Sequence, residues 1–286
     1  MARPLAPDTP PDAALRRIVA ECHADLAKYR SVVLESRRPI GIHQTRVSLR
    51  RLRAALSLFR GAVVGPTESR LVRSMAAEAK WLAGECAPAR DLHVFLTETV
   101  SDVPPVVKRV AARVAKAHLE RARAALTGAR YNAFAAQLTS FGQATDSSSP
   151  SRLDDFGRAV LDQRHDKVEH RGRKLGSLDG KRLHRLRIAI KKLRYAATFL
   201  QPAFASAAAK AYIEATVRLQ GALGALNDRE VAGQMVADIA VAARPTEDVE
   251  KVLRKLAKEA ASGDKHRRRR LQRAWKKFEK AERFWR

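Results

Sequence analysis

Apolar residues recur at intervals of three and four positions along most of the chain, which is the spacing of one buried face of an α-helix. The first stretch shows the pattern well, with Leu15, Val19, Cys22 and Leu26 on one side. Prolines, glycines and short polar segments interrupt the pattern and mark helix ends. The predicted helices cover residues 12–36, 42–61, 67–87, 91–96, 106–127, 131–141, 154–175, 183–202, 203–222, 229–243 and 245–286. No strand-like alternation bounded by turn residues occurs, so the pattern predicts an all-α fold.

Two of the predicted helices are nearly the same segment. Residues 42–61 read IHQTRVSLRRLRAALSLFRG, and 141 residues further on LHRLRIAIKKLRYAATFLQP follows at residues 183–202. The matching positions are His43, Arg46, Arg50, Arg51, Leu52 and Arg53 in the first copy, and His184, Arg187, Lys191, Lys192, Leu193 and Arg194 in the second. This internal duplication predicts two antiparallel helical bundles. They comprise residues 12–141 and 152–286, joined by a linker at 142–151 and preceded by a flexible tail at 1–11.

Each of the two helices has two faces. At about 100° per residue, the His and the cations at positions 43, 46, 50 and 53 fall within an arc of roughly 80°, well separated from the apolar arc of Leu49, Leu52, Leu56 and Phe59. The second copy repeats this division, with Leu186, Ile190, Leu193, Ala197 and Leu200 on its apolar arc. Neither segment contains Asp or Glu. Like charges three or four residues apart destabilise a helix by about 0.2–0.5 kcal/mol per pair. The rows therefore predict a site for an external polyanion, the alternative being two solvated basic faces.

The composition strengthens the expectation of an anionic partner. Fifty-six Lys and Arg against 30 Asp and Glu give a formal net charge of +26, and the sequence pI is near 11. A charge excess of this size indicates nucleic acid, a membrane surface or a phosphate polymer. The N-terminus lacks the apolar core of a signal peptide, and two cysteines form neither a metal cluster nor a disulfide framework. We therefore expect a cytoplasmic protein without metal or cofactor.

These motifs resemble the CHAD family, named for its conserved histidine α-helical domain. The resemblance rests on His-x-x-Arg followed by a basic cluster and Leu-x-Arg, found twice, and on Arg90-Asp91 and Asn227-Asp228 after the third helix of each half. It extends over residues 12–286 and includes the closing segment from Ala274 to Trp285. It implies two four-helix bundles related by a pseudo-two-fold axis around a basic central groove or pore. It also implies binding of inorganic polyphosphate and, as for several bacterial members, association with polyphosphate granules.

The resemblance and the basic rows together predict the binding residues. We expect polyphosphate contacts from His43, Arg46, Arg50, Arg51, Arg53, His184, Arg187, Lys191, Lys192 and Arg194, with Arg30, Arg171 and Lys174 as further candidates. Arginine forks onto phosphate oxygens, lysine acts as a point charge and histidine donates from its ring. Arg51 and Lys192 project away from the rows and are expected to line a flank. A supplementary basic surface is expected around Arg171, Arg173 and Lys174 and in the run at 265–270.

The expected protein is a stand-alone family member that binds polyphosphate without catalysis. Family members are often fused to a triphosphate-hydrolysing domain marked by alternating glutamates, and no E-x-E-x-K segment occurs in this sequence. A nucleic-acid-binding helical protein remains an alternative, although no helix-turn-helix or zinc pattern is visible. A metal-dependent phosphohydrolase could use His165-Asp166 with Glu169-His170, but we interpret that segment as solvated. The histidines of the two rows could instead be structural, and we interpret Asp91 and Asp228 as helix caps.

Overall fold

The computed structural model describes residues 5–36, 38–94, 105–144, 151–243, 251, 254 and 264–286. In these ranges the regular structure is helical throughout and contains no strand, which confirms the all-α prediction. The α-helices are α1 (Pro11–Glu35), α2 (Pro39–Leu58), α3 (Pro66–Val94), α4 (Pro105–Thr127), α5 (Ala129–Gln143), α6 (Leu153–Gly172), α7 (Gly180–Leu200), α8 (Ala208–Ala243) and α10 (Asp264–Glu279). Short 3-10 turns are η1 (Arg60–Ala62), η3 (Leu175–Ser177) and η4 (Gln201–Ala203).

Proline begins several of these helices. Pro11, Pro39, Pro66 and Pro105 stand at the first positions of α1, α2, α3 and α4, where a missing backbone N–H costs nothing because that group has no partner within the helix. Helix α7 begins differently: the side chain of Asp179 accepts a hydrogen bond from the backbone N–H of Arg182 at 2.7 Å. α7 begins 141 residues after α2, the same spacing as that between the two sequence motifs.

Two predicted helix breaks are wrong. Helix α3 continues through Pro88 to Val94, and α8 continues through Asn227 and Asp228 to Ala243. Pro88 cannot donate to the carbonyl of Gly84, so α3 loses one hydrogen bond at this point. The side chains of Cys86 and Leu92, on either side of the proline, are nevertheless buried. Packing of the apolar face on both sides of Pro88 therefore outweighs the local preference for a break.

The end of the chain also differs from the predicted single helix. Helix α10 ends at Glu279, and the last residues fold back on the second half of the protein. Trp285 is 1% exposed, its ring packs against Tyr212 at a centroid distance of 4.9 Å, and its indole N–H donates to Asp162 at 2.9 Å. Parts of the predicted N-terminal tail, linker and last helix, at residues 1–4, 145–150, 244–250, 252–253 and 255–263, lie outside the described residues.

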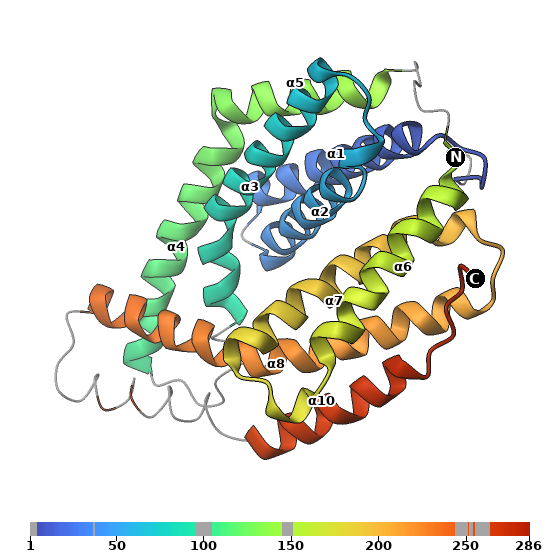
Figure 1. Ribbon diagram of the computed structural model, residues 1–286. Coiled ribbons are helices and arrows are strands. Elements are labelled where there is room, and N and C mark those ends of the chain that lie inside the picture. The colour runs from blue at the N-terminus through green and yellow to red at the C-terminus, as the bar shows by residue number, and fades with distance from the viewer. Residues whose placement is uncertain are drawn as a thin grey trace.

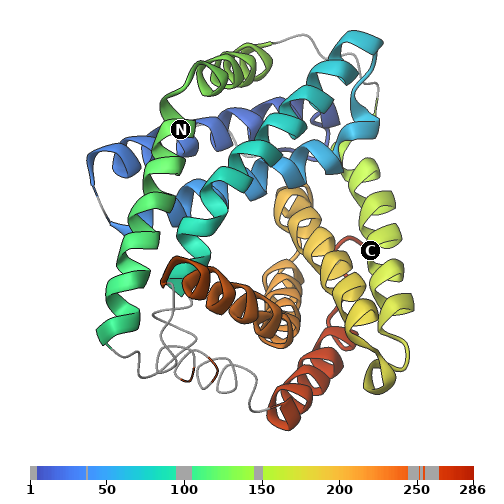
Figure 2. The ribbon, with the colours of Figure 1, turned by 90° about the vertical axis from the view of Figure 1, so that its left-hand side faces the viewer.

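The helices pack mainly against their neighbours in sequence. In the first half α2 lies between α1 and α3, with α5 against α1 and α4 against α3; in the second half α7 lies between α6 and α8, and α10 covers α8 (Figure 1). The two halves meet where α2 packs against α7 and where α4 packs against α8 (Figure 2). Near the α2–α7 contact the rings of Phe59 and Phe156 stack at a centroid distance of 5.3 Å. The two basic helices are therefore direct neighbours.

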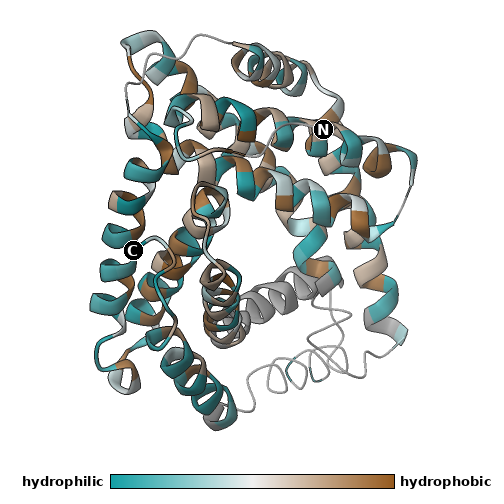
Figure 3. Ribbon diagram, turned by 90° about the vertical axis from the view of Figure 1, so that its right-hand side faces the viewer, coloured by the Kyte–Doolittle hydropathy of each residue, from teal (hydrophilic) through white to brown (hydrophobic). Residues whose placement is uncertain are grey.

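The apolar arcs predicted for α2 and α7 form part of the core. Their members are all 0–1% exposed: Leu49, Leu52, Leu56 and Phe59 in the first half, and Leu186, Ile190, Leu193, Ala197 and Leu200 in the second. Colouring by hydropathy shows that hydrophobic and hydrophilic residues occupy different sides of the helices (Figure 3). Burial of one side fixes the rotation of α2 and α7 about their axes, so the basic rows must face away from the apolar core. Among the described residues, no helix is long and apolar enough to cross a membrane.

Candidate anion-binding site

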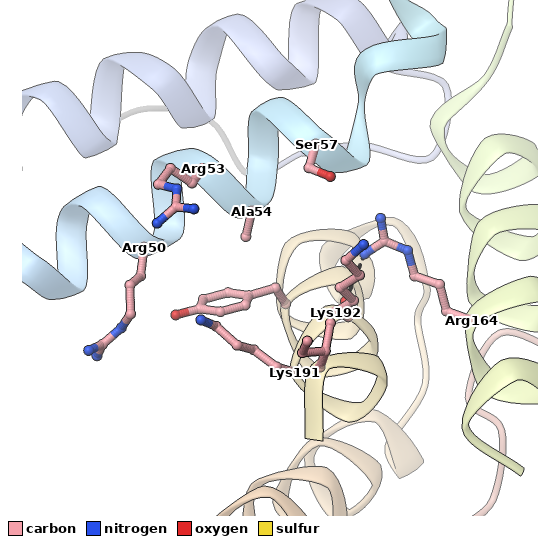
Figure 4. A pocket seen from close by; sticks show the side chains of 9 residues that line it. Arg50, Arg53, Ala54, Ser57, Arg164, Lys191 and Lys192 are labelled. Atoms are coloured by element: carbon pink, nitrogen blue, oxygen red, sulfur yellow. Dashed lines mark hydrogen bonds between the residues drawn. The ribbon is translucent and has the colours of Figure 1, made fainter. Parts of the chain in front are cut away.

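A hollow of about 270 Å³ lies where α2, α7 and α6 meet (Figure 4). Its lining residues are Arg50, Arg53, Ala54 and Ser57 of α2, Arg164 of α6, and Ile188, Lys191, Lys192 and Tyr195 of α7. Five of these residues are cations and none is an acid. We call this hollow the α2–α7 pocket. Its walls come from both copies of the basic motif and from one helix that lacks the motif.

Arg50 of α2 and Lys191 of α7 both extend into the open space between the two helices (Figure 4). They occupy corresponding positions in the two sequence copies. Loss of hydration lowers the pKa of Lys191 to about 8, with further lowering by the charges of Arg50, Arg187, Arg53 and Arg194. Cations from both helices therefore act on the same amine. Among the described side chains, neither Arg50 nor Arg53 forms an ion pair with an acid, and the same holds for Lys191.

Arg164 closes the pocket on the side of α6, and the sequence reasoning missed it. Its Nη1 donates to the backbone carbonyl of Lys192 at 2.7 Å, which fastens α6 to α7. Burial lowers the pKa of Arg164 to about 10. The pKa of Lys192 is also lowered, first by burial and then by the charges of Arg164, Lys167, Arg171 and Arg60. Nothing in the local sequence of α6 distinguishes Arg164, because its position depends on how α6 packs against α7.

Arg46 lies in the basic row of α2 but has partners within the protein. Its Nη2 lies 3.4 Å from Oδ1 of Asp91, and its Nη1 donates to the carbonyl of Ala83 at 3.2 Å. Burial lowers the pKa of Arg46, while Asp91 opposes this effect. Asp91, near the end of α3, therefore pairs with Arg46 of α2. Its prediction as the cap of a separate helix is wrong, because α3 continues to Val94. The side chain of Asp228 lies outside the described residues.

Arg51 and Arg30 point to other parts of the molecule. Arg51 forms ion pairs with Asp25 at 3.2 Å and Glu21 at 3.6 Å, both on α1. Arg30 donates from Nε to the carbonyl of Leu126 at 2.8 Å, and its guanidinium lies over the ring of Tyr131. Neither residue lines the α2–α7 pocket. The short distances assign both side chains to contacts between helices, and their predicted ligand contacts stay predictions.

The remaining candidates do not line the pocket. His43 is half-buried, His184 is exposed and Arg187 is half-buried. Arg194 lies over the ring of Tyr195 at 4.7 Å, and Tyr195 itself lines the pocket. Arg171 donates from Nη1 to the carbonyl of Arg185 at 2.9 Å, which joins α6 to α7. Lys174 is exposed, in a left-handed conformation (φ 58°) just before η3.

The segment considered for metal-dependent hydrolysis is a packing cluster. His165 is 2% exposed, which overturns its interpretation as solvated. Its Nδ1 lies 2.7 Å from the hydroxyl oxygen of Tyr212, and its Nε2 lies 3.1 Å from a carboxylate oxygen of Glu169. Burial is the first cause of its lowered pKa. In the part of the chain that the structure describes, no three His, Cys, Asp or Glu side chains are grouped as metal ligands.

Comparisons with known proteins agree with this helical fold. A family model described as the CHAD domain matches residues 17–237. The crystal structure of the CHAD domain from the plant Ricinus communis is similar, with a TM-score of 0.81 and 25% sequence identity over 99% of this chain and 96% of that chain. PptA from Streptomyces chartreusis shares the fold, with a TM-score of 0.58 and 16% identity over 96% of this chain and 99% of that one. No curated protein matches the chain.

Proposed function

The chain belongs to the CHAD domain family, and from this premise we propose that it binds inorganic polyphosphate in the α2–α7 pocket. The observation that carries the proposal is the convergence of five cations from three helices on one hollow whose lining contains no acid. Such an arrangement is unfavourable by itself, because the lysine amines lose hydration and face like charges. A bound polyanion removes this repulsion. The site is therefore complementary to a ligand with many negative charges.

The residues of the pocket suit phosphate groups. Arg50 and Arg53 present guanidinium forks that match pairs of phosphate oxygens, and Lys191 supplies a point charge between the two helices. A hydrogen bond to a charged group contributes about 1.5–3 kcal/mol before the cost of ordering the ligand. Polyphosphate exposes oxygens on all sides and has no base, so its recognition requires cations without specific base contacts. We infer a binding role without catalysis, in the cytoplasm and in association with polyphosphate granules.

The proposal also explains why the basic segment occurs twice in the sequence. We infer that the two halves are copies related by a pseudo-two-fold axis, each a four-helix bundle that presents one basic row to a shared central groove. Support comes from the matched motifs, the 141-residue spacing of α2 and α7, and the contact between these helices. Each copy contributes part of the lining, so both halves are required for a complete site.

Charge reversal of Arg50 and Lys191 tests the proposal. The variant Arg50→Glu with Lys191→Glu should lose binding of a labelled long-chain polyphosphate while retaining its helical content by circular dichroism. The matched control is Arg109→Glu with Lys116→Glu, two exposed cations on α4 that line neither hollow described in this structure. Both variants change the net charge equally, so a general electrostatic effect would weaken binding in both. Equal affinities of the pocket variant and the parent would refute the proposed site.

Competition separates polyphosphate from nucleic acid as the ligand. Unlabelled single-stranded DNA, RNA and ATP should each displace the labelled polyphosphate poorly at equal concentrations of phosphate groups. Binding should weaken with added salt because counterions are released from the polyanion. Displacement by DNA or RNA at least as effective as that by polyphosphate would identify a nucleic-acid-binding protein instead.

A further inference from the structure

A second basic hollow, of about 670 Å³, lies between η3 and α10, outside the α2–α7 pocket. It is lined by Leu175, Arg269, Gln272, Arg273, Trp275, Lys276 and Glu279. Three of these residues are cations and one, at the C-terminal end of α10, is an acid. We call this region the α10 surface. The packing of helices in the second half does not explain why the α10 surface is positively charged.

Helix α10 divides sharply into a buried side and a basic side. Leu271, Ala274, Trp275 and Phe278 are at most 9% exposed and pack into the core. The opposite side carries exposed cations that form no ion pair among the described side chains: Arg269, Arg270, Arg273, Lys276 and Lys277. An ordinary solvated helix would mix acids into such a row, since like charges at this spacing are destabilising. The row therefore resembles those of α2 and α7 in its chemistry.

The position of α10 relative to α6 and α7 is fixed by a close contact. A Cβ atom on Gly172 would lie 1.8 Å from the ring of Trp275, so only glycine allows α10 to dock on the last turn of α6. Turn η3 follows at Leu175–Ser177, and α7 begins at Gly180. The α10 surface consequently lies beside the connection from α6 to α7 (Figure 1).

Basic residues lead from the α2–α7 pocket to this connection. On α7, Arg187 and His184 precede Lys191 at intervals of four and three residues, and Gly180 is roughly 16 Å from Lys191 along the helix. On α6, Lys167 and Arg171 are near enough to lower the pKa of Lys192. Arg171 also bonds to the carbonyl of Arg185 on α7 and immediately precedes Gly172. The basic positions thus continue from the pocket along the α6–α7 edge towards α10.

Acids near this edge already have partners. Asp179 caps α7 through the backbone N–H of Arg182 and lies 3.8 Å from the guanidinium of the same residue. Glu169 on α6 pairs with Arg283 at 3.3 Å and with His165. These carboxylates do not offset the exposed cations of α10. Glu279 is the exception, and it lies at the end of the hollow furthest along α10.

We propose that a polyphosphate chain held in the α2–α7 pocket continues along the α6–α7 edge onto the α10 surface, where Arg269, Arg273 and Lys276 select long chains over short ones. This inference rests on the proposed function and names the form of ligand that the same site prefers. The continuity of the basic positions favours one continuous polymer over a separate acidic partner. A short oligophosphate fills the pocket alone, whereas a long chain gains the additional contacts.

The test compares tripolyphosphate with a long-chain polyphosphate in isothermal titration. Arg269→Glu with Lys276→Glu reverses two cations seven residues apart on α10. The affinity for the long chain should fall about tenfold, which corresponds to about 1.4 kcal/mol, and the affinity for tripolyphosphate should change less than twofold. Arg109→Glu with Lys116→Glu is again the matched control, because the residue types and the seven-residue spacing are identical. This control should bind both ligands as the parent does.

Each outcome of this experiment has a distinct meaning. An unchanged long-chain affinity in the α10 variant overturns the inference, and so does an equal loss for the short and long ligands or an equal loss in the α4 control. The proposed function is tested separately by R50E/K191E, which should lose both ligands. If that variant binds both normally, the pocket assignment fails even when α10 contributes to binding.

Discussion

Helices α2 and α7 carry the same basic motif but have different electrostatic neighbours. On α2, Arg46 pairs with Asp91 of α3 and Arg51 pairs with Asp25 of α1. On α7, the charges that act on Lys191 all belong to other cations, including Arg50 on the opposite helix. Matching positions of the two similar segments therefore have different roles. Arg46 and Arg51 of α2 hold helices together, whereas Lys191 of α7 forms no ion pair with an acid among the described side chains.

The flanking helices explain part of this difference. The positions of α6 that correspond to Glu21 and Asp25 of α1 by the 141-residue spacing are Asp162 and Asp166. These two acids pair with the C-terminal arginines, at 3.2 Å from Arg286 to Asp162 and 3.7 Å from Arg283 to Asp166. Lys192, which corresponds to Arg51, consequently faces Arg164 instead of an acid. The C-terminal arginines thus pair with Asp162 and Asp166, whereas the corresponding Glu21 and Asp25 pair with Arg51 of α2.

The sharpest way to break the comparison is to remove the charge of Lys191 from α7. Lys191→Met should lower the affinity for long-chain polyphosphate by about tenfold to a hundredfold, because one charge-assisted contact of about 1.5–3 kcal/mol is lost. Its thermal stability should not fall, since four neighbouring cations are relieved of repulsion. Binding and melting measurements on the same preparation check both statements. A large loss of stability would show that Lys191 is structural, like Arg46.

The second-largest expected effect is a pH dependence of polyphosphate affinity, which arises from Lys191 on α7. The pKa of Lys191 is about 8 in the free protein, and a bound polyanion raises it, so binding takes up a proton. Affinity should therefore decrease as the pH rises through 8, by up to about tenfold between pH 7 and 9. The stability of the free protein depends on pH in the opposite sense. Because the pKa of Lys191 is lower in the folded state, the unfolded chain binds more protons between pH 8 and 10, and the contribution of Lys191 to the free energy of unfolding increases as the pH rises.

Replacing the lysine by an arginine provides the control for this pH effect. Lys191→Arg keeps the charge throughout this range, because a guanidinium retains its proton well above pH 9. The affinity of this variant should be nearly constant between pH 7 and 9. Titrations in two buffers with different ionisation enthalpies count the protons taken up. A parent protein with the same flat profile would exclude Lys191 from the site.

A smaller effect is expected for Arg46→Met on α2. The substitution leaves Asp91 without its cation and the carbonyl of Ala83 without its donor. The free energy of unfolding should fall by about 1 kcal/mol, as measured by urea denaturation. Polyphosphate affinity should fall less than in Lys191→Met. The reverse order of the two affinities would assign the main ligand contact to α2.

The smallest effect is expected for Arg51→Met. Its partners Asp25 and Glu21 are 43% and 45% exposed, so these ion pairs contribute between about 0 and 1 kcal/mol to stability. Polyphosphate affinity should change less than twofold, because the side chain points towards α1. The same titration checks this value. A tenfold loss would place Arg51 in the ligand site despite its orientation in the structure.

Much of the architecture could be predicted from residue patterns. The periodic leucines of α2 and α7 predicted both helices and the side that each buries, since burial of apolar area is the strongest local signal in a helical protein. The breaks at Pro88 and at Asn227-Asp228 were wrong because local turn preference is weaker than the packing of a long helix. Prediction of the site was less complete. Arg50, Arg53, Lys191 and Lys192 were named and line the pocket, but Arg164 was missed.

Residue order alone was enough to establish helices, two matching basic rows and a large positive charge, because these properties depend on neighbours three or four positions away and on simple counting. It could not establish which cations are neutralised within the molecule. That depends on acids far away in sequence: Asp91 lies 45 residues from Arg46, and Asp25 lies 26 residues from Arg51. Ion pairs form over a few ångströms, so only the packing of α1, α3 and α6 around the two basic helices decides which charges remain for a ligand.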